Sequence, residues 1–298
     1  MNYRFFTGLI LLTLTAACAG PDTNTPVDQQ LVYLAVRDNG YDLFLNNQEG
    51  TQENQLTTQP GFDWGPRWWA KQNGILHYSQ DTAGNFSHKL ITVAGEEIPY
   101  DFKGLTDFIV SPNGRLVAYT KKVDDQDHVF IYYTNPDIDT HNDVTPFPAY
   151  FGRPKWSPDG KKLLMVSDMS GSQELYLYDE YYGELDQLTE GEGRAKYATW
   201  SPDGKKIAFT REVLEAPKKD HDIYILDLKT REITQLTDTP FGEQEISWSP
   251  MGDKIAYHGT IDGKDDIYTI DLETKEVKKI TQGQGYHGEP AWIPIYQQ

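Results

Sequence analysis

Short stretches in which apolar and polar residues alternate recur along most of the chain. Leu163–Val166, Ile207–Thr210 and Ile255–His258 are compact apolar runs, and a second alternating stretch follows each of them. Alternation with a period of two is typical of a β-strand that buries one face. The units then end in a Leu-Thr pair or a close relative, as at Leu188-Thr189 and Leu236-Thr237. The pattern therefore predicts a repeating unit of short strands.

A turn motif separates these strands at regular intervals. Trp156-Ser-Pro-Asp-Gly160 recurs at Trp200–Gly204 and, with Met in place of Asp, at Trp248–Gly252, so the tryptophans lie 44 and 48 residues apart. Val110–Gly114 is the same turn without Trp, and we expect Trp69 to hold the corresponding position one unit earlier. Pro presets φ for a type I turn and Gly closes it, so each motif predicts a tight hairpin. We expect each Trp to pack between neighbouring units as a large apolar wedge.

Four short strands in about 45 residues make one blade of a β-propeller. Counting from Leu31 gives six blades, of which the first lacks a Trp strand, while the chain ends with one Trp strand too many, Glu289–Trp292. We expect the last strand to complete the first blade, because this pairing closes the ring and leaves little exposed edge. The sequence thus predicts an all-β fold, a six-bladed β-propeller over residues 31–298.

The repeat resembles that of a known family. The run Trp-Ser-Pro-Asp-Gly-Lys-Lys-Ile-Ala-Phe at Trp200–Phe209, followed by Asp-Ile-Tyr and Leu-Thr, is similar to the repeat of TolB-like propellers. The resemblance extends over residues 31–296 and is most specific in blades four to six. It implies an envelope protein that contacts a peptidoglycan-associated lipoprotein with one face of its propeller. TolB carries an additional N-terminal α/β domain, for which the short segment before residue 31 has no room, so a lipid-anchored relative with the propeller alone fits better.

The first 30 residues indicate export. Met1–Arg4 is short and positively charged, Phe5–Leu14 is apolar, and small residues precede Cys18, as in a signal peptide over residues 1–17. Leu14–Cys18 resembles a bacterial lipobox, which implies that Cys18 is lipidated and that residues 18–30 are a flexible tether. The alternative is an ordinary cleaved signal with an incidental cysteine. The residue after Cys18 is not the Asp of the inner-membrane retention signal, so we expect the periplasmic face of the outer membrane.

Composition narrows the class of partner. The net charge of −18 is spread along the chain, and a surface of that sign repels phosphate backbones, so nucleic acid is an unsuitable partner. The aromatic content of 13% agrees with an all-β protein, because aromatic side chains suit pleated strands.

Motifs for catalysis are missing from the sequence. It contains no Gly-x-Ser-x-Gly nucleophile elbow, no phosphate-binding loop and no dinucleotide fingerprint, and Cys18 is its only cysteine. The seven histidines are scattered without metal-ligand spacing. Asp137–Asp143 has alternate oxygen ligands but lacks the glycine and the bidentate Glu of a calcium loop, so we interpret it as a solvated hairpin loop. We expect no metal, no cofactor and no enzymatic activity.

The loops that lead into the Trp strands carry the candidate binding residues. In a propeller these strands lie nearest the axis, so the loops before them should surround one mouth of the central channel. Aromatic side chains and Arg are enriched in protein interfaces and ligand pockets. The candidates are Asp63, Trp64, Arg67, Asp107, Tyr150, Phe151, Arg153, Arg194, Tyr197, Glu243, Glu245, His287 and Glu289. The plain alternative is that loops collect polar residues, some of which pair with one another.

Three functions remain open. The favoured one is a monomeric, non-catalytic envelope module that binds a protein or peptide at the channel mouth. The second is a saccharide-binding or saccharide-lyase propeller, since oligogalacturonate lyase is similar in its TolB-like blades and holds a metal in the channel with histidines; here only His287 is expected at the mouth. The third is a sensor or assembly factor whose partner lies on the blade sides.

Overall fold

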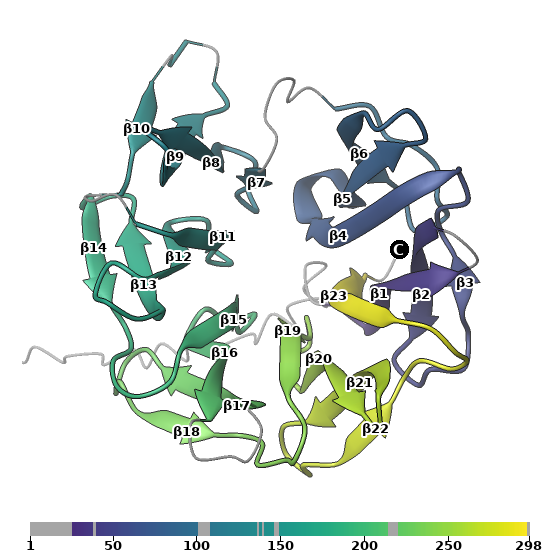
Figure 1. Cartoon of the computed structure of the whole chain (residues 1–298). Helices are drawn as coiled ribbons and strands as arrows, with labels where there is room; N and C mark the ends of the chain where they lie inside the picture. Colours follow the sequence, from purple (N-terminus) through teal and green to yellow (C-terminus); the bar gives the residue numbers. More distant parts are fainter. Residues whose placement is uncertain are drawn as a thin grey trace, which may run out of the picture.

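The computed structural model describes residues 26–37, 40–100, 108–135, 137–138, 140–145, 149–213 and 220–296. Every regular element in these ranges is a β-strand, apart from the three-residue 3-10 helix η1 (Ala70–Gln72). The sheets are arranged radially around a central axis (Figure 1). The expected all-β propeller class is therefore confirmed.

Four of the blades are four-stranded sheets in which neighbouring strands are antiparallel and sequential. The first comprises β7 (Phe108–Val110), β8 (Leu116–Val123), β9 (Gln126–Tyr133) and β10 (His141–Asp143). The second comprises β11 (Phe151–Trp156), β12 (Lys162–Ser167), β13 (Glu174–Asp179) and β14 (Glu184–Gln187). The third comprises β15 (Ala195–Trp200), β16 (Lys206–Val213), β17 (Asp220–Asp227) and β18 (Ile233–Gln235). The fourth comprises β19 (Glu243–Trp248), β20 (Lys254–Ile261), β21 (Lys264–Asp271) and β22 (Val277–Lys279).

The remaining strands form a seven-stranded sheet that contains both ends of the described chain. Its strands are β23 (His287–Ile295), β1 (Asp28–Arg37), β2 (Gly40–Asn47), β3 (Asn54–Gln55), β4 (Gly61–Trp69), β5 (Gly74–Asp81) and β6 (Phe86–Ile91). A single parallel pair, Tyr41 with Phe62, joins β2 to β4, so the sheet divides there into two blade-like halves. These halves and the four sheets above correspond to the six predicted blades within the described ranges.

The last strand completes the first blade, as the sequence predicted. β23 pairs antiparallel with β1 from Asp28 opposite Ile295 to Ala35 opposite His287. β1 begins three residues earlier than the expected domain start at Leu31, and Gln29 is already buried, where it hydrogen-bonds Asp253 at 3.0 Å. This pairing ties the two ends of the propeller together and protects the edges of both strands.

The Ser-Pro-Asp-Gly motifs form the predicted hairpin turns. The amide of Gly160 donates to the carbonyl of Ser157 at 2.8 Å, and φ of Gly160 is +70°, a left-handed value that favours glycine. The hydroxyl of Ser157 donates to Asp159 at 2.6 Å and accepts from the amide of Lys162 at 2.9 Å. The same serine contacts recur at Ser201, whereas Ser249 accepts from Lys254 in the same way but donates to Asp253, because Met251 replaces the Asp of the motif. The motif is thus a structural turn in the blades that carry it.

The Leu-Thr pairs have a structural role as well. The hydroxyls of Thr57, Thr189, Thr237 and Thr281 each accept from a buried backbone amide, at 2.8–3.0 Å, of a neighbouring strand. Three of them also donate to a buried carboxylate, as Thr281 does to Asp266 at 2.8 Å. A buried backbone amide without a hydrogen-bond partner is costly. The threonine hydroxyl supplies the missing acceptor at the place where the outermost strand ends.

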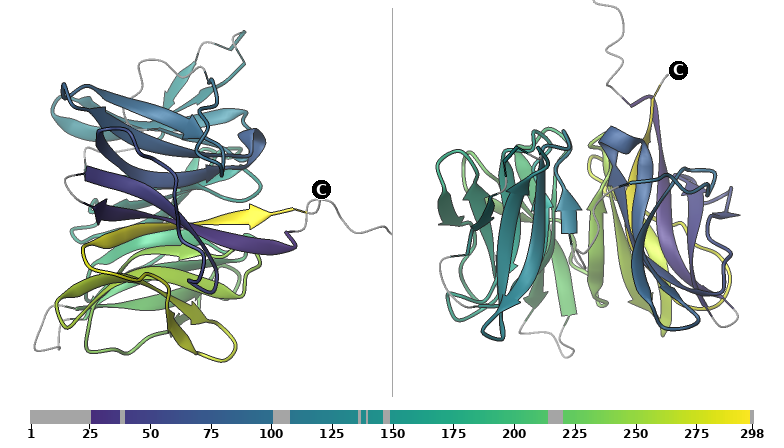
Figure 2. Two further views of the ribbon diagram at one scale, coloured as in Figure 1. Left: turned by 90° about the vertical axis from the view of Figure 1, so that its right-hand side faces the viewer. Right: turned by 90° about the horizontal axis from the view of Figure 1, so that it is seen from above.

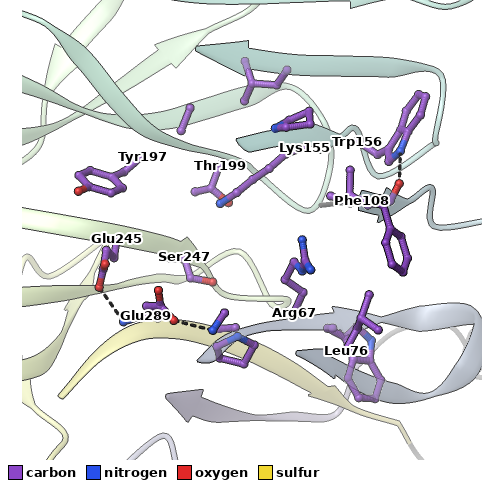
Figure 3. A pocket seen from close by; sticks show the side chains of 18 of the residues that line it. Arg67, Leu76, Phe108, Lys155, Trp156, Tyr197, Thr199, Glu245, Ser247 and Glu289 are labelled. Atoms are coloured by element: carbon purple, nitrogen blue, oxygen red, sulfur yellow. Dashed lines mark hydrogen bonds between the residues drawn. The ribbon is translucent and has the colours of Figure 1, made fainter. Parts of the chain in front are cut away.

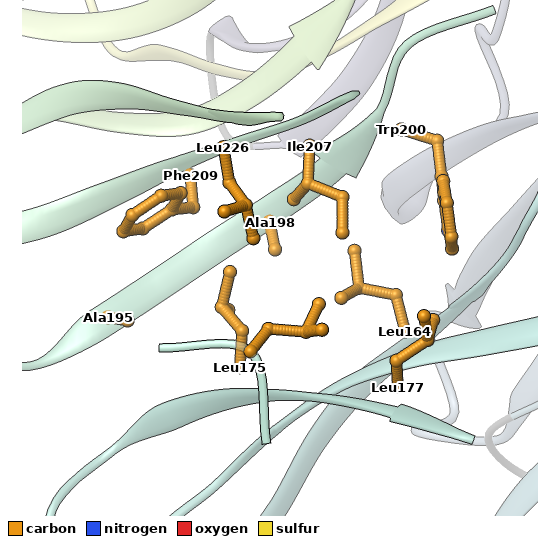
Figure 4. Packing of buried hydrophobic residues seen from close by; sticks show 10 residues of the cluster. Leu164, Leu175, Leu177, Ala195, Ala198, Trp200, Ile207, Phe209 and Leu226 are labelled. Atoms are coloured by element: carbon orange, nitrogen blue, oxygen red, sulfur yellow. The ribbon is translucent and has the colours of Figure 1, made fainter. Parts of the chain in front are cut away.

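The cores lie between adjacent blades. Trp200 packs with Ile207 and Phe209 of its own blade against Leu164 and Leu175 of the preceding one (Figure 4). Clusters of the same kind fill the other interfaces between described blades around the ring. Stacking of blades therefore buries the faces that a single blade leaves open.

The structure confirms that Trp side chains pack between neighbouring blades, but it corrects one predicted Trp position. The indoles of Trp156 and Trp200 donate to carbonyls of the preceding blade, Ile109 at 3.2 Å and Lys155 at 3.0 Å. In the blade of β4, register places Trp68, opposite Ile75, in the position of Trp156, so the assignment of Trp69 was wrong by one residue. Trp69 packs instead in the cluster between this blade and the next.

The two faces of the ring differ in which ends of the inner strands they contain. The inner strand of each blade starts at one face and runs to the Ser-Pro-Asp-Gly turns at the other. Asp28 and Ile295 are paired at the turn face, where both ends of the described chain lie (Figure 2). We call the opposite face, where the inner strands begin, the mouth. Within the described ranges no helix is long and apolar enough to cross a membrane.

Candidate functional site

A cavity of about 1530 Å³ lies at the centre of the ring. Its wall is built mainly from the inner strands β4, β7, β11, β15, β19 and β23, so every blade contributes to it. Figure 3 shows side chains from these strands converging on the space between them. A concave site of this size at a common axis is the natural place for a ligand.

The inner strands share an irregularity where they line the cavity. The register with the second strand shifts between Trp64 and Arg67, and it shifts at the equivalent place in β11, β15 and β19. The residues at the shift include Gly65, Tyr197, Glu245 and Glu289, whose φ values are +64°, +47°, +50° and +51°. A bulge with a left-handed residue redirects side chains, and strain of this kind in residues other than glycine is concentrated at functional sites.

Carboxylates connect the bulges of neighbouring blades. One carboxylate oxygen of Glu245 accepts from the amide of Glu289 at 2.7 Å and from the Tyr286 hydroxyl at 3.4 Å. The carboxylate of Glu289 in turn accepts from the amide of Gly65 at 2.5 Å (Figure 3). Each acid thereby satisfies a backbone donor that the bulge removes from the sheet.

An aromatic group occupies the wall beside β4. The rings of Trp64 and Tyr78 are stacked at 5.7 Å, and Phe86 meets Trp64 edge-on at 6.0 Å. His88 connects this group to Phe108, with ring centroids 4.7 Å apart. The Phe86 side chain is 69% exposed, which is unusual for a large apolar side chain. The group thus offers a rigid apolar contact surface at the mouth.

Sequence reasoning did not identify Tyr78, Phe86 and His88 as site residues. They lie on β5 and β6, the second and third strands of their blade, whereas the predicted candidates come only from the segments before the Trp strands. The alternation of aromatic residues along Tyr78 and Phe86–His88 was the available signal.

Positive side chains line the cavity on β4, β11 and β15. The Arg67 guanidinium lies 4.7 Å from the ring centre of Tyr78, a cation–π contact that fixes its position. Lys155 points into the cavity from β11 (Figure 3), and Lys196 lines it from β15. Burial, together with the like charge of Arg194, lowers the pKa of Lys196.

Six of the predicted residues line the cavity and four are structural. Trp64, Arg67, Tyr150, Tyr197, Glu245 and Glu289 belong to the wall. By contrast, Asp63, Glu243 and His287 are buried within the blades, and Arg194 is exposed outside the cavity wall. Most of the candidates also lie within the inner strands themselves rather than in loops before them.

The four structural residues have partners inside the blades. Arg194 forms a two-point ion pair with Glu212 at 2.9 and 3.1 Å, which raises the pKa of Arg194. Glu243 is fully buried and accepts from Thr237 at 3.0 Å and from Thr239 at 2.6 Å. Such contacts hold the ends of the inner strands in place.

The other two structural residues belong to buried histidine–carboxylate pairs, in which His287 lies 3.2 Å from Asp266 and His77 lies beside Asp63. His287 is 1% exposed and donates from Nδ1 to the carbonyl of Asp265 at 3.1 Å; burial lowers its pKa although this bond opposes the shift. Asp63 lies 3.4 Å from Nε2 of His77. Burial acts to raise the pKa of Asp63, but contacts with His77 and Ser79 outweigh it and lower the pKa.

The remaining predictions fall partly outside the described residues. Cys18 and Asp107 lie outside the described ranges, and the side chains of Phe151 and Arg153 are not described. Nowhere in the described ranges do three His, Cys, Asp or Glu side chains gather as a metal-binding cluster. In the hairpin considered for calcium, Asp143 contacts His128 at 2.7 Å and Thr145 at 2.6 Å.

Comparison with known proteins agrees with this architecture. Residues 106–218 match the sequence profile of the TolB beta propeller domain. No curated protein sequence matches the chain. The crystal structure of TolB from Acinetobacter baumannii is similar with a TM-score of 0.73 and 23% identity, covering 89% of this chain and 66% of that chain. The chain thus spans just under two thirds of that protein's length.

Two further structures share the fold. A putative TolB from Agrobacterium tumefaciens has a TM-score of 0.61 at 20% identity, covering 91% of this chain and 99% of that chain. An oligogalacturonate lyase in complex with manganese has a TM-score of 0.57 at 15% identity, covering 85% and 74%. These likenesses concern the fold: the chain is a β-propeller similar to the propeller of TolB.

Proposed function

We propose that this protein is a non-catalytic binding module of the bacterial cell envelope that takes a segment of a partner protein into the mouth of its channel. The observation that carries the proposal is the central cavity, where the aromatic group of Trp64, Tyr78 and Phe86 meets charged side chains from several blades. Aromatic anchors in a concave, partly polar site are typical of protein interfaces. The fold itself does not dictate this function.

The path of the chain suits a protein held on a membrane. Lipidation of Cys18 would attach the tether, which reaches the propeller at Asp28 on the turn face. Ten residues from Cys18 to Asp28 span at most about 35 Å when extended. The turn face is therefore held near the membrane and the mouth is directed away from it, towards other envelope proteins. The protein acts as a monomer in this arrangement.

A saccharide-binding or saccharide-lyase propeller with a metal in its channel is the alternative. The fold shared with the oligogalacturonate lyase and the exposed ring of Phe86 favour it. His287, which the sequence placed at the mouth, instead faces Asp265 and Asp266 inside the blade. A protein segment therefore explains the lining better than a metal-dependent reaction.

Crosslinking and capture from intact envelopes tests the proposal. The variant Trp64→Ala/Tyr197→Asn removes two aromatic rings from the wall, and Asn tolerates the left-handed φ of Tyr197. The matched control is Tyr181→Ala/Tyr182→Ala, which removes two rings that are 81% and 70% exposed on the turn face. We expect one protein captured by the wild type and by the control and lost in the cavity variant. Capture that ignores the cavity variant would place the partner on the blade sides, and stoichiometric manganese binding would favour the alternative.

A further inference from the structure

The acids that line the channel wall lie on two adjacent inner strands, and the positive charges lie on three of the other four. Arg67, Lys155 and Lys196 line the cavity from β4, β11 and β15, whereas the acids that line it, Glu245 and Glu289, belong to β19 and β23. The whole chain has a net charge of −18, so this wall reverses the sign of the surrounding protein locally. At about 0.1 M salt the Debye length is roughly 10 Å, so the electrostatic interactions of a ligand inside the channel are mainly with the charges nearest to it.

The two acids of the wall are already engaged. Glu245 accepts from the amide of Glu289 at 2.7 Å, and Glu289 accepts from the amide of Gly65 at 2.5 Å. Hydrogen bonds from backbone amides stabilise a carboxylate and hold it against the wall. These acids therefore serve the bulges, and Arg67, Lys155 and Lys196 line the cavity from other strands.

Register places the cations at two depths. Arg67 and Lys155 each follow the bulge of their strand directly, opposite Leu76 and Leu164, so they lie at equivalent positions along the axis. Lys196 precedes the bulge of β15 and lies nearer the mouth. Lys196 pairs with Thr210, and Thr199, the position equivalent to Lys155, pairs with Ala208, so the two levels lie two positions of β16 apart, roughly 7 Å. Figure 3 shows Arg67 and Lys155 directed into the same space from different blades.

Lys196 lies in an environment that disfavours its charge. Burial and the like charge of Arg194 lower its pKa, although the carboxylate of Glu212, which is itself paired with Arg194, opposes the shift. A ligand carboxylate would remove this cost, because an opposite charge at short range favours the charged amine.

We infer that the channel takes an extended acidic peptide segment, which places one carboxylate at Lys196 and a second, about two residues further along, between Arg67 and Lys155. This inference rests on the proposed function and specifies the chemistry of the partner. An extended chain advances about 3.3 Å per residue, so the spacing of the acids in the segment matches that of the two levels. The aromatic group beside Arg67 accommodates an apolar side chain of the same segment.

Fluorescence anisotropy with fluorescein-labelled hexaglutamate tests this inference on the full-length protein. Hexaglutamine is the uncharged reference peptide. The variants are Lys155→Gln and Lys196→Gln, and the control is Lys205→Gln, which removes an equal charge from an exposed turn outside the cavity. We expect hexaglutamate to bind more tightly than hexaglutamine, and each cavity variant to weaken it about tenfold, the effect of one charged hydrogen bond. The control should bind as the wild type does, and all variants should unfold at the same temperature.

Two outcomes overturn the inference. One is equal binding of hexaglutamate and hexaglutamine, or absence of binding by both. The other is a loss in Lys205→Gln as large as in the cavity variants, which would reveal nonspecific attraction. The proposed function fails separately: it is contradicted when envelope capture is insensitive to Trp64→Ala/Tyr197→Asn. If that capture depends on the two rings but not on Lys155 or Lys196, the function stands and the acidic segment is wrong.

Discussion

The carboxylate of Glu289 accepts a hydrogen bond of 2.5 Å from the backbone amide of Gly65, in the neighbouring blade. The two residues are separated by 224 positions in the chain and occupy equivalent bulges of adjacent inner strands. The contact lies at the junction of the first two blades, beside the strand that closes the ring. It connects closure of the propeller to the shape of the channel.

Removing this acceptor should destabilise the protein. In Glu289→Ala the Gly65 amide loses its partner in a partly buried place, which costs about 1–3 kcal/mol. Glu289→Gln retains an acceptor oxygen and should cost less than half as much. Urea unfolding of both variants, with Glu192→Ala as an exposed control, measures the difference. Equal stability of the Ala and Gln variants would show that the hydrogen bond contributes nothing.

The left-handed position at Gly65 should not tolerate a side chain. A Cβ there would lie 2.7 Å from Cδ2 of Tyr78, and φ is +64°. Gly263 has a φ of +73° with no atom within 4 Å of the added Cβ, so Gly263→Ala isolates the backbone strain. We expect Gly65→Ala to lower the free energy of unfolding by about 1–3 kcal/mol more than Gly263→Ala, which is the typical cost of forcing a packed side chain out of position. Similar losses in the two variants would mean that the Tyr78 ring moves aside without cost.

The threonine of the Leu-Thr pairs should be important for stability. In Thr281→Val the buried amide of Ile267 and the carboxylate of Asp266 each lose a hydrogen bond, of 3.0 and 2.8 Å. We expect a loss of about 2–4 kcal/mol from two unsatisfied buried groups. Thr234→Val, at an exposed strand position, is the control and should be close to neutral. Thermal unfolding distinguishes the two, and equal melting temperatures would contradict the assigned role.

Acid should weaken the fold partly through His287. Burial lowers its pKa below the usual value of about 6.5, so the unfolded chain binds a proton that the folded protein does not. Stability from this group is present above pH ~6.5 and is lost as the pH falls from there towards the lowered pKa. We expect the free energy of unfolding to fall less steeply between pH 6.5 and the lowered pKa in His287→Gln than in the wild type. Parallel curves would exclude His287 as a source of the pH dependence.

Much of the architecture follows from the repeated turn, because Ser-Pro-Asp-Gly and Leu-Thr encode local hydrogen bonds that recur in most of the blades. Closure by the last strand follows from one missing and one surplus strand. The bulges were not predictable: Tyr197, Glu245 and Glu289 adopt positive φ although none is glycine. Only Gly65-Pro66 carries a sequence signal of such a bend. Since the bulge determines which side chains reach the channel, the sequence could not separate lining residues such as Glu245 from buried ones such as Glu243.

The sequence pattern also did not show how deeply a side chain is buried within its blade. His287 and Asp63 are polar residues near the predicted mouth, yet both are buried against partners on adjacent strands. Phe86 and Tyr78 reach the cavity from outer strands through packing on Trp64, a contact between different strands. Such pairings depend on register and blade stacking rather than on local pattern.

The most direct test of the binding site is photo-crosslinking in intact cells with a photoreactive amino acid at single positions. Tyr150 lines the cavity at the mouth and is 45% exposed, whereas Tyr181 is exposed on the turn face. We expect one discrete protein adduct from position 150 and none from position 181. An adduct from position 181 alone, or the same adduct from both, would contradict a partner site at the mouth of the channel.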